Sequence, residues 1–458
     1  MLFTDSQIQQ IHDGALSILE EIGIKVIRPD YIDKLKKLGF LTDGSWVRIP
    51  RKRAMQQMQS TWIERGESGE SQPFAVGISA YSHMWETVEG TLVSQSCDDS
   101  IRLAQFVGNA SVLWPMLNPT APGHAIDLHP DMQFLHHVKT AFQWCKGARV
   151  MEAVSCNTAP YYYEMLDVMG QSTDSVPVYT VSPLTLFGES FDIVFSHPER
   201  YKQINVTALP SLGANTPLSL VGAYAQTAAE TLGAAVICEE ITGVPATYKP
   251  SLYTFDFRTM SMPFGSPEKL LLEWANNEVT ARLGGYPVSI KSVDIHTNAV
   301  KAGVQAVMEK GMLAVAGAMR GARGFYCIGT LAMDEVFSPV QLLLDLEMLE
   351  HLKTILDGMP VEDWNGDLIE EIRTGIEEGF ISSERTLLNY KNYAWFPKMM
   401  NRYSLGAVLD RKIPDAMEKA VGLAGELFSK EPVWRLDDGK YNELEKIFRR
   451  AAESILAN

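Results

Sequence analysis

The sequence lacks the features that mark secreted, membrane-spanning and nucleic-acid-binding proteins. Its five cysteines are scattered over 458 residues without a Cys-x-x-Cys pair, which argues against a disulfide framework or a structural zinc site. No signal peptide precedes the first helix, and no uncharged apolar run reaches the ~18 residues that a membrane helix needs. There is no basic excess, because 40 Lys and Arg face 56 Asp and Glu. We therefore expect a cytoplasmic protein that binds neither membranes nor nucleic acid.

The motifs of several enzyme classes are missing as well. The chain has no Gly-x-x-x-x-Gly-Lys phosphate loop, no Gly-x-Ser-x-Gly elbow and no His-Glu-x-x-His. Despite nine histidines, we predict no bound metal. The acidic pairs Glu239 with Glu240 and Asp334 with Glu335 leave a carboxylate-dependent hydrolase open. Adjacent residues of a helix point to different faces, however, which favours a solvated helix end for the first pair.

The first hundred residues predict a mixed helical and strand cap. Apolar residues recur at three- and four-residue spacing from Ile8 to Ile22, and the pattern stops at Gly23. Shorter helices are expected at 32–38 and 51–62. Residues 74–96 have the pattern of antiparallel strands around the Glu89-Gly90 turn. We take residues 1–105 as an N-terminal α+β cap.

From about residue 110 onward, short apolar strands alternate with helical stretches. Strands are expected at 112–117, 149–155, 176–182, 205–209, 246–248, 288–291 and 324–328. Helices are expected at 132–145, 161–169, 218–241, 268–283, 299–318 and 340–356. This alternation predicts an α/β fold with right-handed crossovers and a parallel sheet, and the number of units favours a (β/α)8 TIM barrel over residues 106–360. An open α/β sheet is the alternative. Residues 361–458 would add an eighth strand at 380–382 and a C-terminal helical extension.

Aromatic residues near the ends of the expected strands are the main candidates for a site. If they meet at the barrel mouth, they would form a cage that attracts a quaternary ammonium through cation–π contacts. Polar residues in neighbouring loops could meet a substrate carboxylate. The proposed cage consists of Tyr179, Phe187, Phe255, Phe257 and Tyr326, and the polar candidates are Asn215, Arg258 and His296. For the aromatic residues, ordinary core packing is the alternative.

His296 has a second interpretation. The segment 294–299 nearly spells Asp-x-His-x-x-Gly, the motif by which corrinoid-binding domains donate a histidine to cobalt. Ala299 stands where that motif has glycine, and no Gly-Gly segment follows at the expected distance. We therefore expect this chain not to hold a corrinoid itself.

Several segments resemble the trimethylamine methyltransferase family, in the same order and at similar spacing along nearly the whole chain. The first is the helix Ile11-His-Asp-Gly-Ala-Leu-Ser-Ile-Leu-Glu-Glu-Ile-Gly-Ile-Lys-Val26. The others are Cys97-Asp-Asp99 to Arg102-Leu-Ala104, Ser182-Pro-Leu184, Ala223-Tyr-Ala-Gln-Thr-Ala-Ala-Glu230, Phe337-Ser-Pro-Val-Gln-Leu342 and Trp395-Phe-Pro397 to Arg402. The trimethylamine enzymes carry pyrrolysine, whereas every letter here is a standard residue. Near the segment 379–386, Arg385 stands where the family usually has histidine.

The resemblance implies a (β/α)8 barrel of the branch without pyrrolysine, similar to glycine betaine:corrinoid methyltransferases. Such an enzyme would move a methyl group from a quaternary amine to the cobalt(I) of a corrinoid (cobalamin) carried by a separate corrinoid protein. No residue would be required as acid or base, and no cofactor would be tightly bound. We also expect a homo-oligomer. A non-catalytic betaine-binding or regulatory barrel is the competing interpretation.

Overall fold

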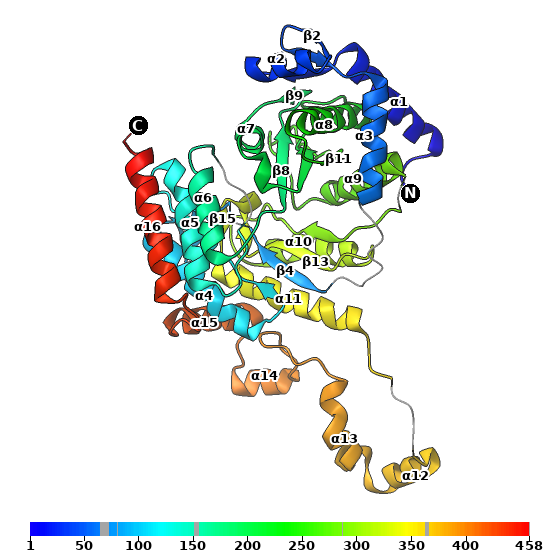
Figure 1. The fold of residues 1–458 in the computed structure, drawn as a ribbon. Coiled ribbons are helices and arrows are strands. Elements are labelled where there is room, and N and C mark those ends of the chain that lie inside the picture. Colours follow the sequence, from blue (N-terminus) through cyan, green and yellow to red (C-terminus); the bar gives the residue numbers. More distant parts are fainter. Residues whose placement is uncertain (65–72, 80, 151–154, 286, 362–365, 458) are drawn as a thin grey trace.

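The computed structural model describes residues 1–64, 73–79, 81–150, 155–285, 287–361 and 366–457. Helices and parallel strands alternate through most of the chain, so the fold is mixed α/β (Figure 1). No helix of the described residues is both long and apolar enough to cross a membrane. The N-terminal helices α1 (Asp5–Glu21), α2 (Pro29–Lys37) and α3 (Arg51–Glu64) confirm the helices expected there.

Helix α1 is specified locally and then fixed by packing. The side chain of Thr4 caps the helix and forms a reciprocal capping box with Gln7. The apolar face of α1 lies against α8 (Leu220–Thr242), a helix rich in alanine and glycine. The contact is close, because a Cβ added to Gly233 would lie 2.5 Å from Cγ1 of Ile24 and 2.6 Å from Cδ2 of Leu19.

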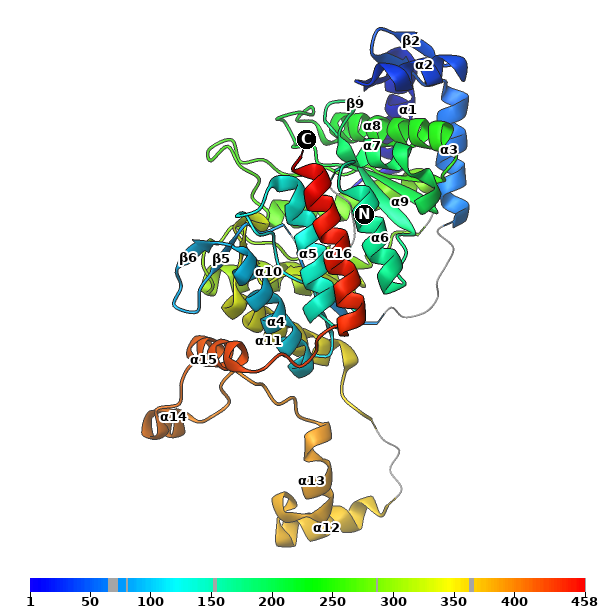
Figure 2. The ribbon, with the colours of Figure 1, turned by 60° about the vertical axis from the view of Figure 1, so that its left-hand side comes forward.

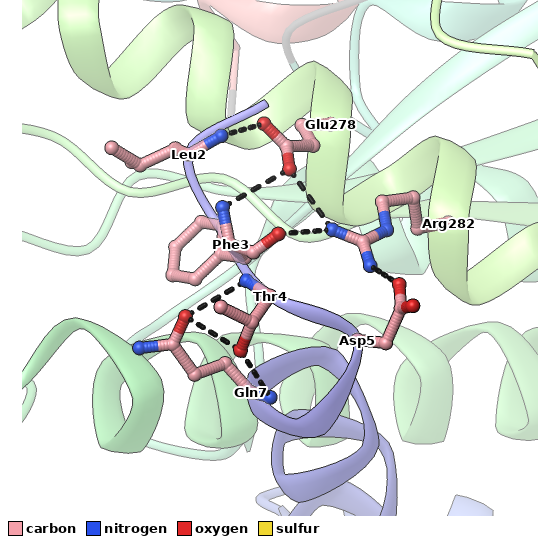
Figure 3. A network of polar contacts seen from close by, with 7 residues as sticks. All are labelled: Leu2, Phe3, Thr4, Asp5, Gln7, Glu278 and Arg282. Atoms are coloured by element: carbon pink, nitrogen blue, oxygen red, sulfur yellow. Dashed lines mark hydrogen bonds and ion pairs between the residues drawn. The ribbon is translucent and has the colours of Figure 1, made fainter.

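The residues before α1 are held by α9 (Pro267–Gly284), as Figure 3 shows. Backbone N–H groups of Leu2 and Phe3 donate to the Glu278 carboxylate at 2.6 and 3.2 Å. Arg282 donates to the Phe3 carbonyl at 2.6 Å and to the Asp5 carboxylate at 2.5 Å. Burial raises the pKa of Glu278, but these donors outweigh it and the pKa lies below its usual value. The Glu278 carboxylate is therefore negatively charged and accepts hydrogen bonds from Leu2, Phe3 and Arg282.

Two parallel sheets form the centre of the molecule. One has the order β11-β10-β8, from β8 (Ser175–Thr180), β10 (Gln203–Ala208) and β11 (Ala246–Lys249). The other has the order β12-β13-β4-β7, from β4 (Ala75–Ile78), β7 (Leu117–Asn118), β12 (Ser292–Asp294) and β13 (Gly324–Ile328). In the described residues the pairing does not close, because β7 does not pair with β8, nor β11 with β12.

Two smaller sheets lie beside the parallel ones. The first has the order β2-β3-β1-β9, from β1 (Ile24–Val26), β2 (Leu41–Asp43), β3 (Trp46–Arg48) and β9 (Thr185–Leu186). The second has the order β14-β15-β5-β6, from β5 (Met84–Glu86), β6 (Leu92–Ser94), β14 (Thr330–Leu331) and β15 (Val336–Phe337). The hairpin β5–β6 confirms the antiparallel strands expected around Glu89-Gly90.

The remaining helices cover the sheets or extend from them. Those between the strands are α4 (Cys97–Leu113), α5 (Pro130–Trp144), α6 (Ala159–Met169), α7 (Glu189–Ser196), α10 (Val304–Ala318) and α11 (Pro339–Asp357), with the short η1 (Pro198–Arg200) and η2 (Ala332–Asp334). Near the C-terminus, α15 (Ala416–Ser429) packs on α4 and α11, and α16 (Asp438–Ile455) packs on α5 and α6. Between them and α11, the helices α12 (Leu368–Glu378), η3 (Phe380–Ser382), α13 (Glu384–Asn389), η4 (Tyr390–Asn392) and α14 (Leu405–Arg411) extend away from the body (Figures 1 and 2).

Four expected strands differ from the structure or lie partly outside the described residues. Residues 112 and 113 end α4, and the strand there is only Leu117–Asn118. The strand expected at 288–291 was wrong by four residues, because β12 spans Ser292–Asp294. The strand expected at 380–382 was also wrong, since those residues form η3, and β4 supplies a further parallel strand instead. Of the strand expected at 149–155, residues 151–154 lie outside the described residues.

Candidate functional site

The best-defined polar cluster lies where β12 and β13 end. These strands pair in parallel, so the residues that follow each of them meet at one edge of the sheet. His296 comes two residues after β12, and Cys327 is the next-to-last residue of β13. The chain then forms the hairpin β14–β15, and η2 between its strands carries Asp334.

His296 and Asp334 form a buried pair. Nε2 of His296 lies 2.9 Å from Oδ2 of Asp334, and each side chain is only 13% exposed. Burial raises the pKa of Asp334, but the hydrogen bond and charge of His296 outweigh it, so the pKa lies below its usual value. The other two polar atoms of the pair, Nδ1 of His296 and Oδ1 of Asp334, are buried without a hydrogen-bond partner among the described residues.

Cys327 completes a cluster of three residues with metal-ligating atoms. One atom each of His296, Cys327 and Asp334 lies within 4.8 Å of the other two. Such a set of imidazole, thiol and carboxylate could hold a transition metal, which the sequence did not predict. Burial raises the pKa of the Cys327 thiol well above its usual value, so with no metal bound the group is a neutral thiol.

The backbone around this cluster is strained. Cys327, Ala332, Met333 and Asp334 all have positive φ, between 47° and 83°, a region that residues with a Cβ rarely adopt. Strain of this kind costs on the order of 1–3 kcal/mol per residue and persists only where the surroundings enforce it.

A buried ion pair enforces part of this geometry. Nζ of Lys310, fully buried on α10, donates to Oδ2 of Asp345 at 2.7 Å and to the Cys327 carbonyl at 3.0 Å. The same carboxylate accepts from the Gly329 backbone N–H at 2.8 Å and from Gln341 at 2.7 Å. The backbone at the end of β13 is therefore anchored at two points, the carbonyl of Cys327 and the N–H of Gly329.

Aromatic rings lie next to the cluster. Phe264 packs on His296 with ring centroids 5.0 Å apart, and Tyr253 packs on Phe264 at 5.9 Å. Burial raises the pKa of Tyr253, and the nearby carboxylate of Asp294 raises it further. Tyr326 lies over the backbone of two glycines, since a Cβ added to Gly77 would be 2.7 Å from its ring.

The charge of this edge is negative. Asp294 ends β12, is exposed, and pairs with no Lys or Arg of the described residues. The two nearby lysines already have partners, because Lys269 pairs with Glu273 at 2.6 Å and Lys310 pairs with Asp345. A cation would thus meet carboxylates here that no buried lysine neutralises.

The structure brings some of the expected site residues together and leaves others apart. His296 belongs to the edge just described. The ring of Tyr326 on β13 lies against Gly77 and against Gly324 at the start of that strand, and Tyr179 lies on β8. Phe255 and Phe257 contact each other at 5.1 Å, and Phe257 approaches the Gly213 turn.

The remaining three expected residues lie in exposed loops. Asn215 is exposed, and its side-chain oxygen accepts from the Ser211 N–H at 2.7 Å. Arg258 is 90% exposed and forms an ion pair with Asp256 at 2.9 Å. Phe187 is 50% exposed after β9.

Five residues of this edge were not expected as part of it. Asp294 could have been recognised as a carboxylate at the end of a strand, and Asp334 was considered only together with Glu335. No sequence signal identifies the others, which reach the site through packing. The five are Tyr253, Phe264, Asp294, Cys327 and Asp334.

The other acidic pair has a structural role. Glu239 accepts from Gln57 at 2.9 Å and from the Ala246 N–H at 3.0 Å, whereas Glu240 pairs with Arg53 at 2.7 Å. The two carboxylates tie α8 to α3 and β11, and they do not face a common substrate.

Comparison with known proteins gives a consistent result. The family model of trimethylamine methyltransferase (MTTB) matches residues 1–96 and 166–455. Trimethylamine methyltransferase MttB of Desulfitobacterium hafniense is 23% identical over 84% of this chain and 80% of its own. MttB2 of Methanosarcina mazei is 23% identical over 91% of this chain and 90% of its own. Proline betaine:corrinoid methyltransferase of Eubacterium limosum is 20% identical, over 91% of this chain and 92% of its own.

Proposed function

The chain belongs to the trimethylamine methyltransferase family, and from that membership we propose that it is a quaternary amine:corrinoid protein methyltransferase. It would move a methyl group, with glycine betaine as the preferred donor, to cobalt(I) of a corrinoid on a separate protein. The observation that carries the proposal is the family match over most of the chain, joined to a negative, aromatic edge at the ends of β12 and β13. The activity would be cytoplasmic.

The chemistry agrees with a chain of standard residues. A quaternary ammonium already carries its positive charge, so loss of a methyl group leaves a neutral tertiary amine and needs no proton. The protein's part is to hold the ammonium in line, exclude water and supply negative potential near it. Asp294 and the rings of Tyr326 and Tyr179 have the chemistry for this task, since cation–π contacts and carboxylates both attract ammonium groups.

The position of His296 argues against a corrinoid held by this chain. In the Asp-x-His-x-x-Gly motif the histidine offers a free ring nitrogen to cobalt, whereas His296 is 13% exposed and its Nε2 faces Asp334. We therefore propose that a corrinoid protein docks over the ends of the parallel strands. When bound there, the corrinoid would supply the nucleophilic metal, and this chain would supply the oriented methyl donor.

A closed (β/α)8 barrel is also part of the proposal. The two parallel sheets contain seven strands, which follow one another in chain order from β4 through β13, and β13 pairs with β4. Such a barrel would also require contacts across two gaps, between β7 and β8 and between β11 and β12, where the described residues show no pairing.

Within that barrel, we propose that aromatic rings form a cage for the quaternary ammonium group. Its rings are those of Tyr179, Phe187, Phe255, Phe257 and Tyr326, and Asn215, Arg258 and His296 are the candidates for the carboxylate end. Arg258 can serve only if substrate competes with Asp256 for its guanidinium.

The test is a methyl-transfer assay with purified protein, chemically reduced cobalamin and a panel of quaternary amines. Methylcobalamin should form with glycine betaine faster than with trimethylamine or without donor. Calorimetric binding of betaine without methylcobalamin formation for any donor would instead establish the binding-module interpretation. Formation with another quaternary amine alone would keep the reaction and correct the substrate.

We propose further that the protein is a homo-oligomer. On α12, Leu368, Ile369, Ile372 and Ile376 are between 42 and 75% exposed, and among the described residues the main packing partner of this helix is η3. The outer face of α10 carries a second apolar stripe, at four- and three-residue spacing, in which Val304, Met308, Met312, Val315 and Met319 are between 46 and 83% exposed. In an oligomer, the apolar stripe on α12 of one copy would pack against the apolar stripe on α10 of the other copy.

Mass measurement by light scattering tests this arrangement. Ile376→Glu and Met312→Glu should each lower the molecular mass toward that of one chain, and Thr374→Glu on another face of α12 should not. A monomeric wild type, or an oligomer unaffected by both substitutions, would contradict the arrangement.

A further inference from the structure

We infer that His296, Cys327 and Asp334 bind one divalent transition-metal ion, with zinc as the best match. Imidazole, thiolate and carboxylate are the three ligand types that zinc takes in proteins, and its preference for four ligands leaves one position open in a site with three. Magnesium and calcium are disfavoured because they prefer oxygen ligands.

The geometry of the three side chains supports this inference. Their ligand atoms lie within 4.8 Å of one another, so an ion placed among them would be near all three. Nε2 of His296 and Oδ2 of Asp334 are already 2.9 Å apart. A metal ion would replace the contact between these two atoms with bonds from each of them to the ion.

The unpartnered atoms point the same way. Nδ1 of His296 and Oδ1 of Asp334 are buried and have no hydrogen bond among the described residues. Leaving a buried polar atom without a partner is costly, and a native protein retains such atoms where they have another use. A metal ion bound at Nε2 of His296 would use the free lone pairs of the Asp334 carboxylate, whereas Nδ1, on another edge of the imidazole ring, would not contact the same ion.

The surroundings hold the ligands as metal sites require. The Lys310–Asp345 pair fixes the carbonyl of Cys327 and the N–H of Gly329, and positive φ angles at Cys327 and Asp334 turn the backbone at both positions. Outer contacts of this kind orient ligands in known metal sites. They also explain why the chain maintains strained backbone in a turn with little exposed surface.

The charge is suited to a dication. With the thiolate of Cys327 and the carboxylate of Asp334 as ligands, the charge of a zinc ion would be neutralised within the site, and Asp294 would add negative potential nearby. Both buried lysines of the region already have carboxylate partners and do not oppose it.

The open position suggests a role that rests on the proposed function. A carboxylate oxygen at the far end of a betaine could occupy it, leaving the ammonium toward the aromatic rings of Tyr326 and Tyr179. The metal would then position the substrate, and the methyl transfer itself would not pass through it.

The test measures metal binding directly and apart from activity. Chelator-treated protein is incubated with Zn²⁺, desalted and analysed by mass spectrometry of the elements, and a parallel sample receives Co²⁺ for absorption spectroscopy. The expected result is about one metal per chain and a thiolate-to-cobalt charge-transfer band in the near ultraviolet. Cys327→Ser should abolish the band, and His296→Ala and Asp334→Asn should weaken Zn²⁺ binding at least about tenfold.

Cys156→Ser is the matched control, because this cysteine is only partly buried and lies outside the cluster. It should retain the metal and the band. The inference would be overturned if wild-type protein retained no metal. It would also be overturned if the metal content were unchanged in Cys327→Ser and His296→Ala. Both results are read from the metal content and do not depend on enzyme activity. Metal binding without methyl transfer would refute the proposed function alone. Methyl transfer by metal-free protein that never binds zinc would refute this inference alone.

Discussion

Glu230 offers the sharpest test of how the site is supported. It lies in the middle of α8 and is fully buried. Its Oε1 accepts from the hydroxyls of Thr180 and Ser182, and its Oε2 accepts from the Leu184 N–H at 2.8 Å. One carboxylate therefore fixes the segment that follows β8, the strand that carries Tyr179.

Two substitutions of Glu230 should differ strongly in stability. In Glu230→Gln, the amide NH2 can donate to the two hydroxyls, which turn to accept, while its oxygen accepts from Leu184. Because burial raises the pKa of Glu230, the neutral amide also avoids a desolvation penalty. We expect Glu230→Gln to cost less than about 1 kcal/mol of unfolding free energy.

Glu230→Ala removes all three acceptor contacts. The Leu184 N–H cannot turn to another partner, and a buried donor left unpaired costs about 1–3 kcal/mol. Adding the void left by the side chain, we expect a loss of about 2–4 kcal/mol. Glu230→Ala also removes the cost of burying a carboxylate, and the lower end of that range allows for this stabilising effect.

The assay is urea unfolding followed by circular dichroism, with the methyl-transfer rate measured on the folded fraction. Glu230→Gln should retain most of the wild-type rate, whereas Glu230→Ala should lose rate as well as stability. Equal costs for the two variants, or an alanine variant as stable as wild type, would show that the three hydrogen bonds do not hold this segment.

Two further predictions concern pH and the packing of Tyr326. Burial lowers the pKa of His124 and His136 to about 4 and of His137 to about 3, so folding keeps them neutral while the unfolded chain takes up protons below about pH 6.5. Stability should therefore fall between pH 6.5 and 4, by about 2 kcal/mol per histidine at pH 5, and a urea midpoint that stays constant from pH 7 to 5 would contradict this. Gly77→Ala would place its Cβ 2.7 Å from the ring of Tyr326, so the ring must move and the KM for the quaternary amine should rise. Gly422→Ala on α15, where a Cβ meets nothing within 4 Å, should leave KM unchanged, and equal effects would refute the role of the ring.

The sequence predicts helices better than strands here, for a physical reason. Helix α8 spans 23 residues, and its apolar and small residues predict it to within two residues at each end. Strand β12 has only three residues, and the apolar Val288 and Ile290 before it suggested a strand four positions early. Pairing with β13, a contact distant in sequence, decides where such a short strand lies.

The His296 cluster was hidden for a similar reason. His296 and Asp334 are 38 residues apart, and they meet because β12 and β13 are neighbours and the chain turns back through residues with positive φ. Those conformations at Ala332 and Met333 contradict the ordinary preference of these residues, so no propensity argument finds them. Expected loop residues such as Asn215 failed to join this cluster because local turns already use their side chains.

The segments by which the chain resembles its family make structural contacts with one another. Ser182 and Leu184 of one segment bind Glu230 of another. Ser338 caps α11, and Gln341 of the same segment accepts from the Gly303 N–H and donates to Asp345, which holds the turn after Cys327. These shared residues thus build the frame around the ends of the strands. These contacts hold the frame and do not indicate which quaternary amine is used. A substrate panel is therefore a stronger test of specificity than any further comparison of these segments.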